Sequence, residues 1–189
     1  MLCSELTLVN EVPGVARIMP LLCRCWTCEN CNPMRKARLV KECLEGTPNT
    51  FITLTANRKV GLTPEYRARL LVNAWRIIRR RAKKLYHYKQ IPFMAVFEAT
   101  KNGEPHLHIL CRVKWIGQPW LSRQMQSIMS SPIVDIRRIK NPNKMANYVA
   151  KYVGKDPHHF KGTKRYWRSL DYLAPEPPFE GRKPAYDVW

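Results

Sequence analysis

Acidic residues are scarce in this chain of 189 residues. Only 14 Asp and Glu stand against 33 Lys and Arg, which gives a formal net charge of +19. A small domain with such a surplus of one sign repels itself unless a polyanion shares its surface. The composition therefore favours nucleic acid as the partner, ahead of an anionic membrane surface.

Long apolar runs are absent as well. No stretch approaches the ~20 apolar residues of a membrane span, and the first residues lack the basic region and apolar core of a secretory leader. We therefore expect a cytoplasmic protein with no membrane partner. Hydrophobic residues still make up 45% of the chain, with eight Tyr and six Trp, which favours a globular domain over a disordered chain.

Histidine is another scarce residue, yet two of the five His stand one residue apart in the apolar run GEPHLHILCRV. Side chains alternate along a strand, so His106 and His108 share one face while Leu107 and Ile109 share the other. Two neutral imidazoles at a fixed separation indicate a metal site. The alternative is a pair of histidines that are satisfied by backbone partners.

The preceding strand offers a third ligand. Glu98 stands among apolar and small residues in FMAVFEAT, where a lone buried carboxylate is costly without a cation. A two-residue turn would pair Glu98 with Leu107, whereas a five-residue loop over 100–104 pairs it with His106, on the histidine face. Two His and one carboxylate with open positions suit Mg²⁺ or Mn²⁺, because phosphate oxygens can complete the shell.

A predicted helix near the end of the chain carries two tyrosines and two lysines. Tyr148, Lys151, Tyr152 and Lys155 stand at i, i+3, i+4 and i+7 in NYVAKYVGK and fall on one side of the helix. A phenol is a poor nucleophile at its ordinary pKa, so a lysine or a metal must stabilise its phenolate. Opposite a metal, either tyrosine is placed to attack a phosphodiester. The alternative is a surface helix whose tyrosines lean on the core.

Four of the seven cysteines crowd into CRCWTCENC. We predict that Cys23, Cys25, Cys28 and Cys31 hold a structural Zn²⁺, because a tetrahedral thiolate site stabilises a small knuckle. The odd total and the clustering argue against a secreted disulfide framework. Only some of the four, or none, bind a metal in the alternative readings. Residues that can replace one of the four are Cys3, Cys43, His158 and His159.

Local patterns predict an α+β fold, with a central antiparallel β-sheet, flanking helices and the small Cys-rich zinc knuckle at the N-terminal end. The expected strands cover 50–55, 92–100, 105–113 and 132–140. The expected helices run from Pro33 to just before Gly46, from Pro64 to about His87, and over 121–129 and 142–154. We divide the chain into an N-terminal segment (1–46), a core (47–160) and an aromatic, Pro-rich tail (161–189) that packs irregularly on the core.

The order of FITLT, then Glu98 with PHLHIL, then YVAKYVGK resembles the three motifs of the HUH endonucleases. More narrowly, it resembles the rolling-circle replication initiators of small single-stranded DNA phages, such as microviruses, and of small plasmids. The cysteine motif and basic helix before the first strand are similar to those initiators too. The resemblance covers about residues 23–155.

This resemblance implies a site-specific, metal-dependent nicking and joining enzyme for single-stranded DNA. In that family's pattern His106 and His108 match the metal pair, Glu98 the acid, and Tyr148 and Tyr152 the paired nucleophiles, with Tyr152 favoured if one acts alone. The enzyme would cut an origin hairpin, leaving a 5′-phosphotyrosine and a free 3′-OH. Because the chain has no phosphate-binding glycine loop, a separate host helicase would unwind the DNA and a host polymerase would copy it.

Two further readings stay open. The same chemistry would serve an HUH transposase or a plasmid relaxase. A protein of a different class, a non-catalytic zinc-knuckle module that binds nucleic acid, would share the basic composition and the cysteines without cutting DNA.

Overall fold

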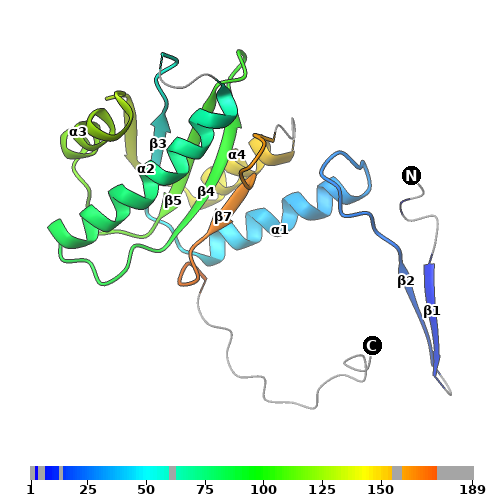
Figure 1. Ribbon diagram of the computed structural model, residues 1–189. Helices are drawn as coiled ribbons and strands as arrows, with labels where there is room; N and C mark the ends of the chain where they lie inside the picture. Colours follow the sequence, from blue (N-terminus) through cyan, green and yellow to red (C-terminus); the bar gives the residue numbers. More distant parts are fainter. Residues whose placement is uncertain (1–2, 4–6, 13–14, 60–62, 155–158, 174–189) are drawn as a thin grey trace.

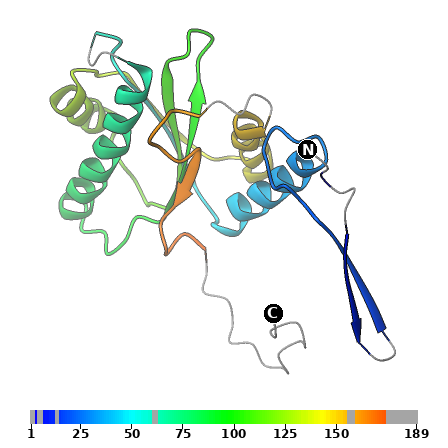
Figure 2. The ribbon, with the colours of Figure 1, turned by 45° about the vertical axis from the view of Figure 1, so that its right-hand side comes forward.

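A five-stranded antiparallel sheet with helices on both faces forms the body of the molecule (Figures 1 and 2). The computed structural model describes residue 3 and residues 7–12, 15–59, 63–154 and 159–173. The sheet order is β6–β3–β5–β4–β7. Its strands are β3 (Thr50–Thr55), β4 (Phe93–Ala99), β5 (Pro105–Cys111), β6 (Val134–Arg138) and β7 (Tyr166–Arg168).

The helices are α1 (Cys31–Glu45), α2 (Pro64–Leu85), α3 (Gln118–Met129) and α4 (Pro142–Gly154). A separate two-stranded hairpin, β1 (Thr7–Val12) and β2 (Val15–Pro20), precedes α1 and projects from the body (Figure 1). No helix among the described residues is long and apolar enough to cross a bilayer.

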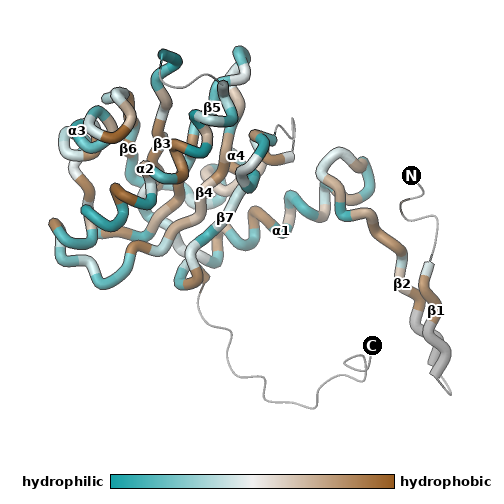
Figure 3. The backbone as a smooth tube through the Cα atoms, viewed as in Figure 1, coloured by the Kyte–Doolittle hydropathy of each residue, from teal (hydrophilic) through white to brown (hydrophobic). Residues whose placement is uncertain are grey.

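One face of the sheet packs against α2 and α3. Leu107, Ile109 and Cys111 of β5 point to this side, where they meet Trp75 and Ile78 of α2. All five side chains are almost completely buried. Figure 3 shows the same contrast along the chain, with hydrophobic segments in the strands and hydrophilic ones in the outer loops. This face forms the larger apolar core.

The other face packs against α1 and α4. Alternate residues of the same strands, such as Phe51 and Leu110, point to this side and meet Leu39 of α1 and Val149 of α4. Because neighbouring residues of a strand point to opposite faces, β5 contributes to both layers at once. The histidines of β5 therefore belong to the α1–α4 side.

The predicted α+β architecture is confirmed, and the predicted helices and strands lie close to the observed ones. One expectation was wrong. The tail was expected to pack irregularly, but Tyr166–Arg168 pairs with β4 and adds an edge strand to the sheet. Tyr172 follows and is fully buried, with its hydroxyl donating to the Cys43 carbonyl at 3.0 Å. Residues 174–189 lie outside the described part of the chain.

Candidate active site and cysteine cluster

The loop between β4 and β5 sets the register of the two strands. It spans the five residues 100–104, and Glu98 consequently lies directly opposite His106. The Thr100 amide donates to the Glu104 carbonyl at 2.9 Å, and the Glu104 amide donates to Thr100 Oγ1 at 3.0 Å. Gly103 supplies the left-handed turn, with a φ of 74°. This register puts the carboxylate of Glu98 on the histidine face.

Arg67 of α2 anchors this loop. Its Nε donates to Glu104 Oε2 at 2.8 Å and its Nη2 donates to Oε1 at 2.9 Å. Arg67 is buried, and the Glu104 side chain is only 17% exposed. A two-pronged contact between a planar guanidinium and a carboxylate fixes orientation as well as distance. The loop is therefore held in one place by a helix on the opposite face of the sheet.

His108 is held at both ring nitrogens. Its Nε2 lies 2.5 Å from Glu98 Oε2 and its Nδ1 lies 3.0 Å from Thr53 Oγ1. A hydroxyl both donates and accepts, so Thr53 supports either tautomer of the ring. When Nδ1–H donates to Thr53, Nε2 carries the lone pair that a cation needs. His108 is 4% exposed, so this orientation is fixed by packing as well.

His106 lies closer to the solvent than His108. Burial, helped by the nearby His108, lowers the pKa of His106 below its ordinary value. The neutral imidazole therefore predominates at neutral pH, and only that form binds a metal. Its ring centroid lies 6.4 Å from that of His108, at 81°.

The donors on this face suit Mg²⁺ or Mn²⁺ in kind, with two imidazoles and one carboxylate. They are more widely spread than a closed metal site. In the described ranges, the only group of three or more His, Cys, Asp or Glu whose ligand atoms all lie within 4.8 Å of one another is a set of four cysteines. Cation binding thus requires His106 to close on the pair formed by Glu98 and His108.

Helix α4 brings both predicted tyrosines to this face. The Tyr152 ring stacks on His108, with centroids 5.4 Å apart and planes at 27°. Tyr148 meets Tyr152 edge-on at 4.8 Å and lies 6.0 Å from His108. Tyr148 is the more exposed of the two. Burial, with smaller contributions from the Tyr148 and Glu98 side chains, raises the pKa of Tyr152, so the neutral phenol is favoured without a cation.

The two predicted lysines do not join this group. Lys151 is exposed and lines a groove between α1 and α4 together with Lys36 and Lys41. It therefore lies on a different side of α4 from the tyrosines that meet His108. Lys155 lies outside the described residues.

Sequence patterns missed two side chains of the site. Thr53 of β3 lies opposite His108 in the ladder and binds its Nδ1. Phe51, two residues earlier on the same face, stacks on the His108 ring at 5.3 Å. The stretch FITLT predicted only a core strand, because its pairing register with β5 has no local signal.

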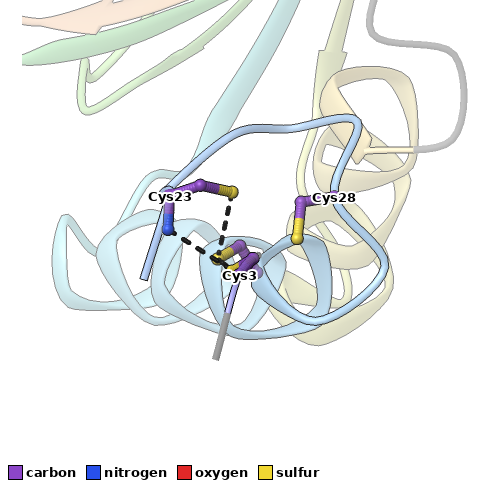
Figure 4. A group of neighbouring side chains, drawn as sticks. Cys3, Cys23 and Cys28 are labelled. Atoms are coloured by element: carbon purple, nitrogen blue, oxygen red, sulfur yellow. Dashed lines mark hydrogen bonds between the residues drawn. The ribbon is translucent and has the colours of Figure 1, made fainter. Parts of the chain in front are cut away.

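The cysteine cluster differs from the predicted set by one residue. The four thiols that lie together belong to Cys3, Cys23, Cys28 and Cys31, at the start of α1 (Figure 4). Cys3 Sγ lies 3.4 Å from Cys31 Sγ, and Cys23 Sγ lies 3.7 Å from it. Cys25 was expected as a ligand, but it lies outside this group, and its thiol donates to the Cys23 carbonyl at 3.5 Å. The position is filled by Cys3, from before the β1–β2 hairpin.

The amide of Cys25 has a different part in the cluster. It donates to Cys23 Sγ at 3.4 Å, and this hydrogen bond is the main cause that lowers the pKa of Cys23 to about 6. The thiolate form that metals bind is thereby favoured at neutral pH.

A single side chain connects the cysteine cluster with the tyrosine helix. Asn32, next to Cys31, donates from Nδ2 to the Trp26 carbonyl at 2.8 Å and to the Gly154 carbonyl at 2.6 Å. Gly154 is the last residue of α4. The same turn that carries the thiols therefore caps the C-terminal end of the helix that carries Tyr148 and Tyr152.

Comparison with known families identifies the class of protein. Residues 49–157, more than half of the chain, match the family model of the Replication-associated protein ORF2. The chain belongs to this family, and it is therefore a replication initiator, a role that implies DNA binding. The matched stretch runs from the start of β3 to just beyond α4 and includes Glu98, both histidines and both tyrosines. No curated protein and no solved structure matches the chain.

The Arg67–Glu104 pair provides a test of the loop. Arg67→Met is expected to lower the free energy of unfolding by about 3 kcal/mol, because Glu104 loses the partner of a largely buried charge. Urea denaturation followed by tryptophan fluorescence measures the change. Adding Glu104→Gln to the variant should recover part of the loss, since the unpaired charge is gone.

The control is Arg38→Met, which removes the exposed partner of the Arg38–Glu42 pair on α1. We expect it to change stability by no more than about 0.5 kcal/mol. Equal losses for Arg38→Met and Arg67→Met would contradict an anchoring role of the buried pair.

Proposed function

We propose that this initiator is a rolling-circle, HUH-type nicking and joining endonuclease that acts on single-stranded DNA at a replication origin. The observation that carries the proposal is the contact of Tyr152 with His108, whose Nε2 in turn meets Glu98. A nucleophile of the right kind thus lies against two side chains that suit a divalent cation. The net charge of +19 supports a polyanionic substrate.

The proposed reaction is a transesterification. The Tyr152 Oη attacks the phosphorus of the scissile phosphodiester, an O–P bond to tyrosine forms, and the bond to the 3′ oxygen breaks. The phenol loses its proton and the leaving 3′ oxygen gains one, so a 5′-phosphotyrosine and a free 3′-OH result. In the joining step a 3′-OH attacks the phosphotyrosine and releases the phenol. One phosphodiester is exchanged for another at each step, so no nucleotide triphosphate is consumed.

Two tyrosines allow the two steps to be divided. Tyr152 is the first choice for opening the origin, because its ring lies on His108. Tyr148 lies 4.8 Å from it, ring to ring, and is more accessible, which suits a second nucleophile that closes the circle. Lys151 on the outer side of α4 is available for a DNA phosphate, and Lys155 remains a proposed companion from the sequence pattern.

Glu98, His106 and His108 are the residues that would hold Mg²⁺ or Mn²⁺. When bound, such a cation polarises the phosphodiester and favours the phenolate. The chain's own contribution is orientation. Thr53 fixes the His108 ring, the five-residue loop places Glu98 opposite His106, and burial keeps His106 neutral.

Alternative activities share these residues. A transposase or a plasmid relaxase would use the same chemistry, but the match to a replication-associated family favours initiation. An origin hairpin as substrate, a microvirus-like or plasmid replicon, and a separate host helicase and polymerase belong to the same proposal. A purely DNA-binding module is the candidate from another class, and adduct formation separates it from the enzyme.

The first test asks whether a tyrosine becomes linked to DNA. The full chain is incubated with Mn²⁺ and single-stranded oligonucleotides that tile the replicon encoding it, and denaturing gels report the covalent adduct. Tyr148→Phe combined with Tyr152→Phe should abolish the adduct, and Tyr152→Phe alone should reduce it by about a hundredfold. Tyr66→Phe on α2 is the control and should leave it unchanged. A persistent adduct in the double variant would refute the tyrosine mechanism.

The second test concerns the catalytic cation. His106→Ala and His108→Ala should each reduce Mn²⁺-dependent adduct formation by about a hundredfold and weaken Mn²⁺ binding measured by calorimetry, because ligands are lost. Affinity for single-stranded DNA should change little. The exposed His159 provides the control, since His159→Ala should affect neither measurement. Normal cleavage by both histidine variants would rule out the metal assignment.

We also propose that Cys3, Cys23, Cys28 and Cys31 hold a structural Zn²⁺. Four thiols that approach one another within 4.8 Å are the usual donor set of such a site, and the lowered pKa of Cys23 favours the thiolate. The site would tie the residue before the β1–β2 hairpin to the first turn of α1. Zinc would thereby stabilise the segment that contacts the end of α4 through Asn32.

Zinc content distinguishes this set from the one that the spacing predicted. Purified protein should contain about one zinc per chain, and Cys3→Ser should lose most of it, because a tetrahedral site needs its fourth thiolate. Cys25→Ser should keep its zinc. Mass spectrometry of the metal content measures both, with thermal melting to show that each variant is folded. Zinc loss in Cys25→Ser but not in Cys3→Ser would overturn the assignment.

A further inference from the structure

A groove of about 520 Å³ opens at one end of the sheet, on the side of α3. It lies where β6 ends and where the chain leaves β5 for α3. Lys114, Trp115, Arg137 and Arg138 line it. Trp115 is 62% exposed, and among the described residues it is the only tryptophan with an exposed side chain of this extent.

Trp115 is exposed but firmly held. The Tyr88 hydroxyl accepts from the Trp115 amide at 2.8 Å and donates to the Trp115 carbonyl at 2.7 Å. The Tyr86 ring meets the indole edge-on at 5.5 Å. The indole also covers Gly117, where an added Cβ would lie 2.7 Å from a ring atom, so the close approach depends on glycine. A large apolar side chain is thus presented to solvent in a fixed position, which lowers the entropy cost of binding to it.

The groove is positively charged. Lys114, Arg137 and Arg138 line it, and no acidic residue stands among the described residues that do so. Asp135 forms an ion pair with Arg137 at 2.7 Å and so offsets one of the three charges. Lys114 and Arg138 remain as the principal cations around the indole.

Strand β6 connects this groove with the tyrosine face. It is an edge strand, and Arg137 lies opposite Phe51 while Arg138 lies opposite Thr50. Phe51 meets Tyr148 edge-on at 5.9 Å, so Arg137 belongs to the tyrosine side of the sheet. Arg138, the next residue, belongs to the other side, where the groove lies. Consecutive arginines thus mark both sides of one sheet edge.

We infer that this groove binds the single-stranded DNA that flanks the cleaved site, with a base stacked on Trp115 and phosphates on Lys114 and Arg138. The inference rests on single-stranded DNA being the substrate, as proposed above, and not on the tyrosine chemistry. A fixed aromatic ring between cations fits a single strand because every base has a stacking face, whereas a base inside a duplex is covered by its neighbours. The strand crosses the edge of β6 on its way to the tyrosines.

Trp115→Ala tests the stacking contact in the full chain. Fluorescence anisotropy with a labelled single-stranded oligonucleotide of mixed sequence should show about tenfold weaker binding, as expected for the loss of one stacked base. Trp115→Phe should recover most of the affinity, because it retains an aromatic face. Leu170→Ala, at a fully exposed side chain elsewhere, is the control and should have no effect. Equal weakening for the matching duplex would overturn the preference for a single strand.

The salt dependence of binding tests the cations independently of Trp115. Arg138→Ala should lower the slope of log affinity against log salt concentration by about 0.7, the value for one phosphate contact on a single strand. Arg80→Ala, at an exposed arginine of the basic helix α2, should leave the slope unchanged. Equal effects of the two variants would show that binding is diffuse, and unchanged affinity in Trp115→Ala would refute the groove.

Adduct formation separates this inference from the proposed function. With saturating origin DNA, Trp115→Ala should form the adduct at the normal rate, because the groove lies away from the tyrosines. Weaker binding by Trp115→Ala in a protein that forms no adduct with any origin DNA would support the groove and reject the nicking chemistry. Normal binding by a variant that forms less adduct would reject the groove and keep the chemistry.

Discussion

The register of β4 against β5 is the constraint on which the candidate site depends. With five residues in the connecting loop, Glu98 lies opposite His106 and one position from the partner of His108. A slip of one residue would turn Glu98 toward α2 and α3, into an apolar layer where a carboxylate has no partner. The buried contact between Arg67 and Glu104 holds the loop from that layer. The apolar side of the sheet therefore determines the geometry of its polar side.

Strand β5 serves both layers through simple alternation. Leu107 and Ile109 are fully buried against α2, while His106 and His108 point to the face covered by α4. The free energy of burial on one side supports polar groups on the other, which by themselves stabilise little. This explains how a chain of modest size keeps two imidazoles and a carboxylate close together in a protein rich in positive charge. Repeated use of period two makes the strand a rigid mount for reactive groups.

Local sequence patterns were sufficient where the signal is short in range. The strand over 50–55, the helix that begins at Pro64, and the pairing of Glu98 with His106 through a five-residue loop all follow from neighbouring residues. Long-range pairings were not predictable in this way. Thr53 reaches His108 only through the register of β3 with β5, and β7 is three residues long, too short for a periodic pattern. Cys3 has no spacing relation to the other thiols, so the local pattern favoured Cys25 in its place.

The placement of the cysteine cluster gives the tyrosine helix a support that lies outside the site itself. Asn32 donates to the last carbonyl of α4, and the Lys36 side chain covers Gly154, where an added Cβ would lie 2.3 Å from it. Helix α4 is thus fixed at its C-terminal end by α1 and near its middle by the stacking of Tyr152 on His108. Two separated contacts define both the position and the rotation of a helix, whereas a single one leaves it free to pivot. For an attack that requires an oxygen in line with a phosphorus, an error of about 1 Å already costs roughly a hundredfold in rate. A cluster of thiols at the start of α1 is therefore part of the geometry of the nucleophile, although no cysteine stands on the catalytic face.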